Sequence, residues 1–117
     1  ANVVHAYEAS QPESLREESC WSPEERERAR RWQALASELT TGLHEVIGHG
    51  SGRMASHVGS PQAALREQYS TLEETRSDLV ALWFIADPVM VELGLIPAAH
   101  HAEVVRAEYE GYARNTI

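Results

Sequence analysis

Residues 39–52 read LTTGLHEVIGHGSG and place His44 and His49 five positions apart at the end of a helical pattern. On a regular α-helix of about 3.6 residues per turn, a five-residue step turns two side chains roughly 140° apart. One extra residue taken up as a π-bulge would return both imidazoles to one face. Gly48 tolerates such a distorted backbone, at a cost of about 1 kcal/mol in a helix. The spacing therefore predicts a helix that is irregular at 46–49.

This helix has a clear beginning. Ser22 is the expected N-cap, Pro23 the first helical residue and Glu25 the third-position acid of a capping box. Apolar residues then recur at helical spacing as far as the glycine-rich residues 48–52, so we expect one helix over 23–49. The apolar positions are Trp32, Leu35, Ala36, Leu39, Leu43, Val46 and Ile47.

The remainder of the chain also predicts helices. A Ser-Pro pair starts a short helix at about 61–69, and Ser70 or Thr71 opens a longer one whose second half, 79–86, is apolar on every side. A helix with such a sequence is expected to be buried all round.

Two further helices complete the pattern. Asp87-Pro88 starts a short helix that Gly94 ends, and Pro97 starts the last helix. Only residues 2–7, NVVHAY, resemble a strand. The sequence predicts a mainly α fold with one short N-terminal strand. The apolar side of the last helix comprises Val104, Val105, Tyr109 and Tyr112.

Composition limits the partners. The 117 residues are enough for a single helical domain, 1–117, with a modest core. The formal net charge is −8 and no basic stripe occurs, so we expect no nucleic-acid partner. No apolar run approaches about 18 residues, so we expect no membrane span. Cys20 is the only cysteine, which fits a reducing, cytoplasmic setting.

The pair His44-Glu45 followed by His49 has the residue types of the zinc motif H-E-x-x-H, with one residue inserted. In that motif both histidines bind the metal and the glutamate is the general base. A catalytic zinc site is expected to use three protein ligands and to leave one position open for water. A third ligand must therefore come from elsewhere in the chain.

The segment LEETRSD at 72–78 offers three carboxylates, Glu73, Glu74 and Asp78, at the start of an apolar helix. One of them could complete a metal site. Acidic residues also suit the N-terminus of any helix because of its positive dipole end. The spacing alone leaves both interpretations open.

The two motifs together resemble the metallopeptidase family of dipeptidyl peptidase III, in its bacterial branch. That family is marked by H-E-x-x-G-H, which reads HEVIGH at 44–49, and by E-E-x-R-[AS]-[ED], which reads EETRSD at 73–78. The flanking HGSG and ALWFIADP also resemble it. The resemblance covers about 36–94, and both motifs in this order are a specific signal.

The resemblance implies a role for each residue of the two motifs. His44, His49 and Glu74 would bind Zn²⁺, and Glu45 would be the general base that activates water. The resemblance also implies that the substrate is a short peptide from which N-terminal dipeptides are released.

The neighbouring acids would support the ligands. Glu73 and Asp78 would accept the second N–H of the two ligand imidazoles. Arg76 would pair with one of these acids or with a surface carboxylate. Ser77 stands where the family often has Ala. The remaining histidines, His5, His57, His100 and His101, are expected to be exposed or hydrogen-bonded.

The family is two-lobed, and its peptide-binding residues would lie outside 1–117. We therefore expect a fragment of a longer metallopeptidase, with the rest of the parent chain completing the cleft, and little activity in the fragment alone. No nudix signature is present. The alternatives are a non-catalytic helical binding or structural zinc module, and a chance match. Glu45 favours catalysis, because a structural site needs no general base and fills its fourth position.

Overall fold

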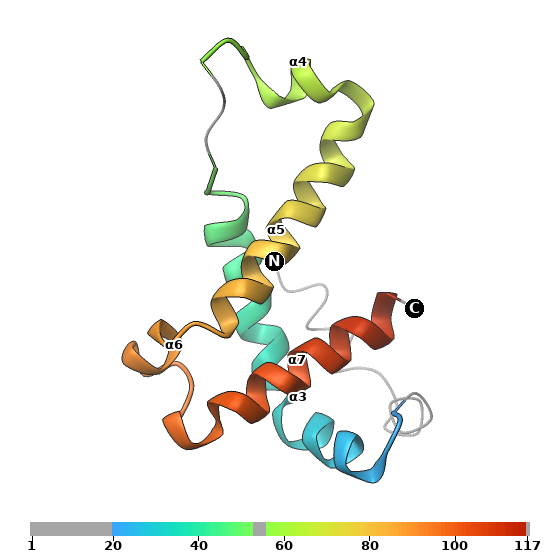
Figure 1. Cartoon of the computed structure of the whole chain (residues 1–117), viewed down its shortest axis with the longest axis vertical. Coiled ribbons are helices and arrows are strands. Elements are labelled where there is room, and N and C mark those ends of the chain that lie inside the picture. Colours follow the sequence, from blue (N-terminus) through green and yellow to red (C-terminus); the bar gives the residue numbers. More distant parts are fainter. Residues whose placement is uncertain (1–19, 53–55, 117) are drawn as a thin grey trace.

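The computed structural model describes residues 20–52 and 56–116, and every regular element in these ranges is a helix (Figure 1). The predicted mainly α fold is thus confirmed for this part of the chain. The strand expected at 2–7 lies outside the described residues.

The first described helix, α3, spans Pro23–Leu43 and continues without a break into a π-helix, His44–Gly48. The Ser22 hydroxyl accepts the Glu25 N–H at 3.1 Å, and the Glu25 carboxylate accepts the Trp21 N–H at 2.7 Å. These two bonds satisfy donors that a helix N-terminus would otherwise leave free. The predicted cap therefore forms, with Trp21 as the second donor.

The later helices follow the predicted order, and their boundaries differ from the predicted ones by a few residues. Helix α4 spans Pro61–Leu65, a 3₁₀ turn spans Arg66–Gln68, and α5 spans Tyr69–Ile85. Arg66 has φ 53° and ends α4, which is therefore shorter than the predicted helix 61–69. Helix α5 begins one residue before Ser70. Helix α6 spans Val89–Glu92.

Gly94 ends the α6 segment with φ 75°, a value that favours glycine. A 3₁₀ turn at Ala98–His100 then leads into α7, His101–Thr116.

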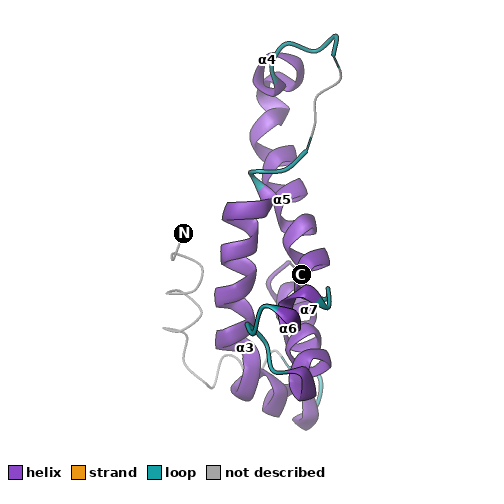
Figure 2. Cartoon of the chain, turned by 90° about the vertical axis from the view of Figure 1, so that its left-hand side faces the viewer, coloured by secondary structure: helices purple, strands orange, loops and turns teal. Residues whose placement is uncertain are grey.

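Helices α3 and α5 run antiparallel, and α7 crosses them at the end of the molecule opposite α4 (Figures 1 and 2). The core lies where α3, the end of α5, the α6 segment and α7 meet. Its fully buried members are Ala36, Ile85, Met90, Ile96 and Val104. Partly buried Trp32, Leu35, Leu39, Leu43 and Val89 pack around them.

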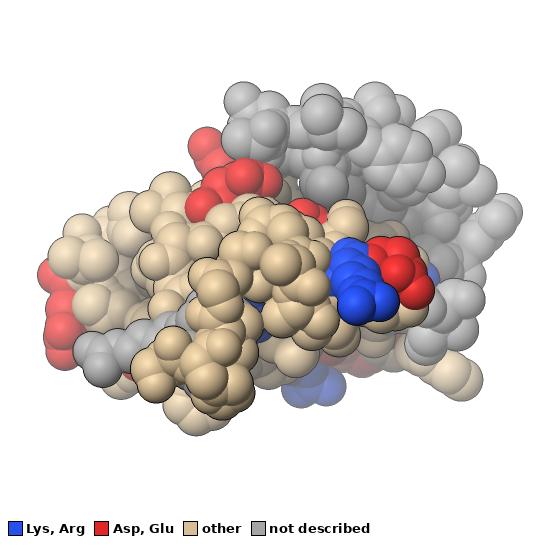
Figure 3. All heavy atoms as spheres, turned by 90° about the horizontal axis from the view of Figure 1, so that it is seen from above, with Lys and Arg blue, Asp and Glu red and all other residues tan. Residues whose placement is uncertain are grey.

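Charged pairs bind α7 to α3 beside this core. Arg114 pairs with Glu25 and donates to the Gln33 side chain at 3.1 Å, and Arg28 pairs with Glu110 at 2.7 Å. On the face shown in Figure 3, acidic side chains lie at several separate positions, and the described Arg side chains form no continuous stripe. This agrees with the net charge of −8.

The expectation that 79–86 is buried all round is wrong. Ala81 and Ile85 are fully buried, but Leu79 is 60% and Trp83 73% exposed. Helix α5 packs against α3 and the π-helix along one face, and no described element covers the other face. An apolar helix is therefore only half covered within the described residues.

The apolar side of α7 also differs from the expected one. Its buried residues are Val104, Ala107, Glu108 and Gly111, whereas Tyr109 is 45% exposed. A Cβ at Gly111 would lie 2.6 Å from the Gln33 amide nitrogen, so the end of that side chain would have to move. No helix in the described part of the chain is long and apolar enough to span a membrane.

Candidate metal centre

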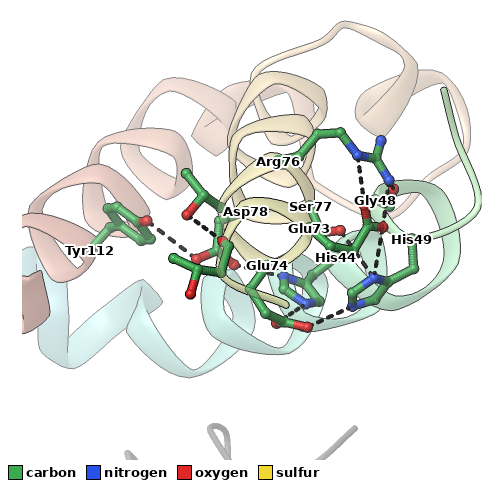
Figure 4. Close-up of polar contacts among 11 residues, drawn as sticks. His44, Gly48, His49, Glu73, Glu74, Arg76, Ser77, Asp78 and Tyr112 are labelled. Atoms are coloured by element: carbon green, nitrogen blue, oxygen red, sulfur yellow. Dashed lines mark hydrogen bonds and ion pairs between the residues drawn. The ribbon is translucent and has the colours of Figure 1, made fainter. Parts of the chain in front are cut away.

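The predicted irregularity is present as a π-turn, which begins two residues before the predicted range 46–49. The His49 N–H donates to the His44 carbonyl at 3.0 Å, an i→i−5 bond, and the π-helix occupies His44–Gly48. The two imidazole rings consequently lie next to one another, edge to face, with centroids 4.7 Å apart and planes at 82° (Figure 4). The five-residue spacing thus brings both rings to one face, as a four-residue spacing would on a regular helix.

Gly48 has a reason to be glycine that the sequence did not reveal. Its φ is not positive, so the backbone conformation itself is open to other residues. A Cβ at Gly48, however, would lie 2.8 Å from the Ser77 Cβ and 2.9 Å from the Ser77 backbone. Both residues are buried. The π-turn and α5 therefore meet at two small residues, which lets α5 lie close to the histidines.

Helix α5 presents its acidic residues to these two rings. One Glu74 carboxylate oxygen lies 3.1 Å from His44 Nε2, and the other lies 3.3 Å from His49 Nε2. One ligand atom from each of the three residues can be chosen so that all lie within 4.8 Å of one another. Figure 4 shows the Glu74 carboxylate between the two rings. Two imidazole nitrogens and one carboxylate are a donor set that suits catalytic zinc.

The other ring nitrogen of each histidine faces a second acid. His44 Nδ1 lies 2.6 Å from Asp78 Oδ1, and His49 Nδ1 lies 3.2 Å from Glu73 Oε1. Asp78 and Glu73 can each accept a hydrogen bond from the Nδ1 that faces them, and each Nε2 would then offer its lone pair to a metal ion beside Glu74. This is the tautomer and orientation that metal-binding histidines require.

Glu73 is held in its ionised form. The hydrogen bond from Arg76 is the main cause of its lowered pKa, and the bond to His49 lowers the pKa further against an opposing effect of burial. Glu73 therefore remains an acceptor for His49 at neutral pH.

The centre is open on one side. The Glu74 side chain is 58% exposed, whereas His44 and His49 are 15% and 30% exposed. Glu45, next in the chain to His44, is exposed, and its carboxylate makes no hydrogen bond or ion pair within the described residues. The structure thus groups His44, His49 and Glu74, and Glu45 is exposed to solvent next to His44 in the chain.

Two contacts were not foreseen from the sequence. The Tyr112 hydroxyl of α7 donates to Asp78 Oδ2 at 3.2 Å, so α7 reaches the acid that holds His44. Burial and the neighbouring Asp78 raise the pKa of Tyr112. The Ser77 hydroxyl lies 3.2 Å from His49 Nδ1. Both are contacts between residues far apart in the chain, and no local pattern signals them.

Two of the three remaining histidines in the described ranges match expectation. His57 is exposed, and His101 Nε2 lies 2.9 Å from the Ile85 carbonyl oxygen. His100 differs, because it is half-buried and packs on the Trp32 ring with centroids 4.8 Å apart. His5 lies outside the described residues.

Comparison with known families agrees with the first motif. Residues 1–66, more than half of the chain, match the sequence profile of Peptidase family M49. The match includes HEVIGH at 44–49, and EETRSD at 73–78 lies beyond its end. A search of curated proteins found no match. With the family's histidine motif folded beside its acidic helix, the chain belongs to peptidase family M49, the zinc peptidases of the dipeptidyl peptidase III type.

Proposed function

We propose that the chain carries the zinc centre of a metallopeptidase, with His44, His49 and Glu74 as the ligands. The observation that carries this proposal is the arrangement of the two imidazoles. Both Nε2 atoms face the Glu74 carboxylate, while Asp78 and Glu73 hold the opposite nitrogens at 2.6 and 3.2 Å. A carboxylate hydrogen-bonded to the ring nitrogen that does not bind the metal is typical of metal-binding histidines.

Glu45 is the proposed general base. Bound zinc supplies a Lewis acid, which lowers the pKa of water toward about 7 and polarises a carbonyl. Glu45 would take a proton from the attacking water and return it to the leaving amine. A carboxylate already engaged by a cation accepts a proton poorly, and the exposed Glu45 is free of such a partner in the described structure.

We propose short peptides as the substrates, with release of N-terminal dipeptides by the parent protein. The support is membership in family M49, together with the open side of the centre at Glu74. The residues that bind the peptide substrate would come from the rest of the parent chain. Without them the 117 residues should be inactive or weakly active, because holding the scissile carbonyl in place contributes several kcal/mol, on the order of 7–11.

The first test is metal content. We expect the chain to bind about one zinc, and His44→Ala, His49→Ala and Glu74→Ala to lose tight binding. His57→Ala is the matched control, because His57 is exposed and stands outside the group. If zinc binds equally well to the three variants, the ligand assignment is wrong.

The second test is activity. A dipeptidyl-arylamide substrate is offered to the zinc-loaded chain, to the longer parent and to the parent with Glu45→Gln. The proposal expects turnover in the parent alone, with zinc content unchanged in Glu45→Gln. An inactive parent with full zinc would favour the alternative, a structural zinc module. An active Glu45→Gln would overturn the role of Glu45.

A further inference from the structure

The guanidinium of Arg76 joins three parts of the metal centre without touching any of the three ligands. It projects from α5 and donates twice to the Glu73 carboxylate, at 3.1 Å from Nε and 2.6 Å from Nη2. Nη2 also donates to the Gly48 carbonyl at 2.8 Å, and Nη1 donates to the Ser51 hydroxyl at 3.0 Å. Figure 4 shows Arg76 reaching over the end of the π-turn.

The Gly48 carbonyl is a group that needs a donor. It lies at the C-terminal end of the π-helix, where helical carbonyls have lost their partners within the helix. Ser51 supplies two longer bonds, 3.1 Å from its hydroxyl and 3.4 Å from its N–H. Arg76 makes the shortest bond of the three, and it is the only charged donor among them.

This bond acts directly on His49, because the Gly48 carbonyl and the His49 N–H belong to one peptide unit. The N–H side of that unit is fixed by the π-turn bond to His44, at 3.0 Å. The carbonyl side is fixed by Arg76. Both ends of the peptide that carries His49 are therefore held.

The imidazole of His49 is held by the same guanidinium through a second route. Arg76 fixes the Glu73 carboxylate, and Glu73 Oε1 lies 3.2 Å from His49 Nδ1. One side chain thus sets the backbone and the ring orientation of a single proposed ligand.

We propose that Arg76 is a positioning residue of the metal centre, which locks the π-turn and aims His49 at the metal. This inference rests on the proposed zinc function. A simple alternative is that Arg76 forms only an i,i+3 ion pair with Glu73 on α5, a type of contact that stabilises helices little. The bonds to the Gly48 carbonyl and Ser51 argue against that alternative, because they leave α5 and cross to the π-turn.

The proposal demands a guanidinium and not merely a positive charge. Two parallel donors for Glu73 and a further donor directed at a carbonyl need the rigid, planar fork of arginine. The ammonium of lysine is a compact point charge on a flexible stem. Arg76→Lys should therefore fail to restore the site, although it preserves the charge.

The experiment compares the unsubstituted 117-residue chain with its Arg76→Met and Arg76→Lys variants. The zinc Kd is measured by chelator competition, and Co²⁺ absorption spectra report the ligand geometry. Arg106→Met is the matched control, because it also removes an arginine in an ion pair, here an exposed i,i+4 pair with Glu110 on α7. We expect both Arg76 variants to raise the zinc Kd about 10- to 100-fold and to change the Co²⁺ spectrum, and Arg106→Met to do neither.

A metal-free readout separates this inference from the proposed function. Hydrogen exchange of the His49 amide, measured in the apo-protein, should become faster in both Arg76 variants because the π-turn bond opens more often. Circular dichroism tests folding, and Arg76→Lys supports the comparison if Arg76→Met does not fold. An unchanged zinc Kd and an unchanged exchange rate of the His49 amide would overturn the proposal. If Arg76→Lys kept both values of the unsubstituted chain, a positive charge would be enough and a guanidinium would not be required. If the unsubstituted chain binds no zinc, the proposed function fails. The exchange rates of the His49 amide still decide whether Arg76 holds the π-turn.

Discussion

Gly48→Ala is the substitution for which the structure gives the clearest magnitude. The new Cβ would lie 2.8 Å from the Ser77 Cβ and 2.9 Å from the Ser77 Cα and carbonyl oxygen. Two of these three atoms belong to the backbone of α5, which cannot rotate away. Overpacking of this kind costs about 1–3 kcal/mol, and a rigid neighbour places the cost near 3 kcal/mol. The gain in helix propensity from Gly to Ala is about 1 kcal/mol, so we expect a net loss of about 2 kcal/mol.

Gly42→Ala is the matched control for this prediction. Gly42 lies in α3, and a Cβ there would meet nothing within 4 Å. The same chemical change should therefore stabilise the chain by up to about 1 kcal/mol. The assay is urea unfolding of the apo-proteins, followed by chelator competition for zinc. Gly48→Ala should also weaken zinc binding about tenfold or more, because parting α5 from the π-turn moves Glu74 away from the rings. If Gly48→Ala behaved as Gly42→Ala does in both measurements, the close packing against Ser77 would not matter.

The remaining predictions concern Tyr112, Cys20 and the two faces of α5. Tyr112→Phe removes the bond to Asp78 and should cost about 1 kcal/mol in the free energy of unfolding. Because the pKa of Tyr112 is raised in the folded chain, this stability is fully present below the ordinary pKa of 10.0 and is lost as the pH rises through the pKa of the folded state. The difference in unfolding free energy between the two proteins, measured in urea, should therefore shrink in that pH range. A difference that stays constant with pH would contradict the prediction. Burial raises the pKa of the Cys20 thiol above its ordinary value of 9.0, so alkylation at pH 8 should be slower in the folded chain than in the denatured chain. Leu79→Ala should change stability by less than about 0.5 kcal/mol, whereas Ile85→Ala should cost about 2–5 kcal/mol, because Leu79 is 60% exposed and Ile85 is fully buried.

The π-turn could be predicted from sequence because its cause is local. Two histidines five positions apart can share a face only if the helix takes up one extra residue, and no tertiary information is needed for that conclusion. The capping signals at Ser22 and Ser60 are local in the same sense, and both hydroxyls accept the expected backbone N–H. Helix identities and beginnings were therefore predicted well.

The remaining features depend on contacts between distant residues. The bond from Tyr112 to Asp78 joins positions 34 residues apart, and the contact of Gly48 with Ser77 joins two small residues that have no distinctive pattern. The apolar half of α5 shows the same limit. Composition alone says that Leu79 and Trp83 are apolar, but it does not say which side of the helix another element covers.

His44, His49 and Glu74 should together bind one metal ion, and zinc K-edge X-ray absorption on the zinc-loaded chain can identify the ligands. We expect two imidazole nitrogens at about 2.0–2.1 Å and carboxylate oxygen at about 2.0–2.2 Å. In His49→Ala one imidazole should disappear from the spectrum, and in His57→Ala the spectrum should be unchanged. If the unsubstituted chain does not show two imidazoles, or if His49→Ala leaves the spectrum unaltered, these residues are not the zinc ligands.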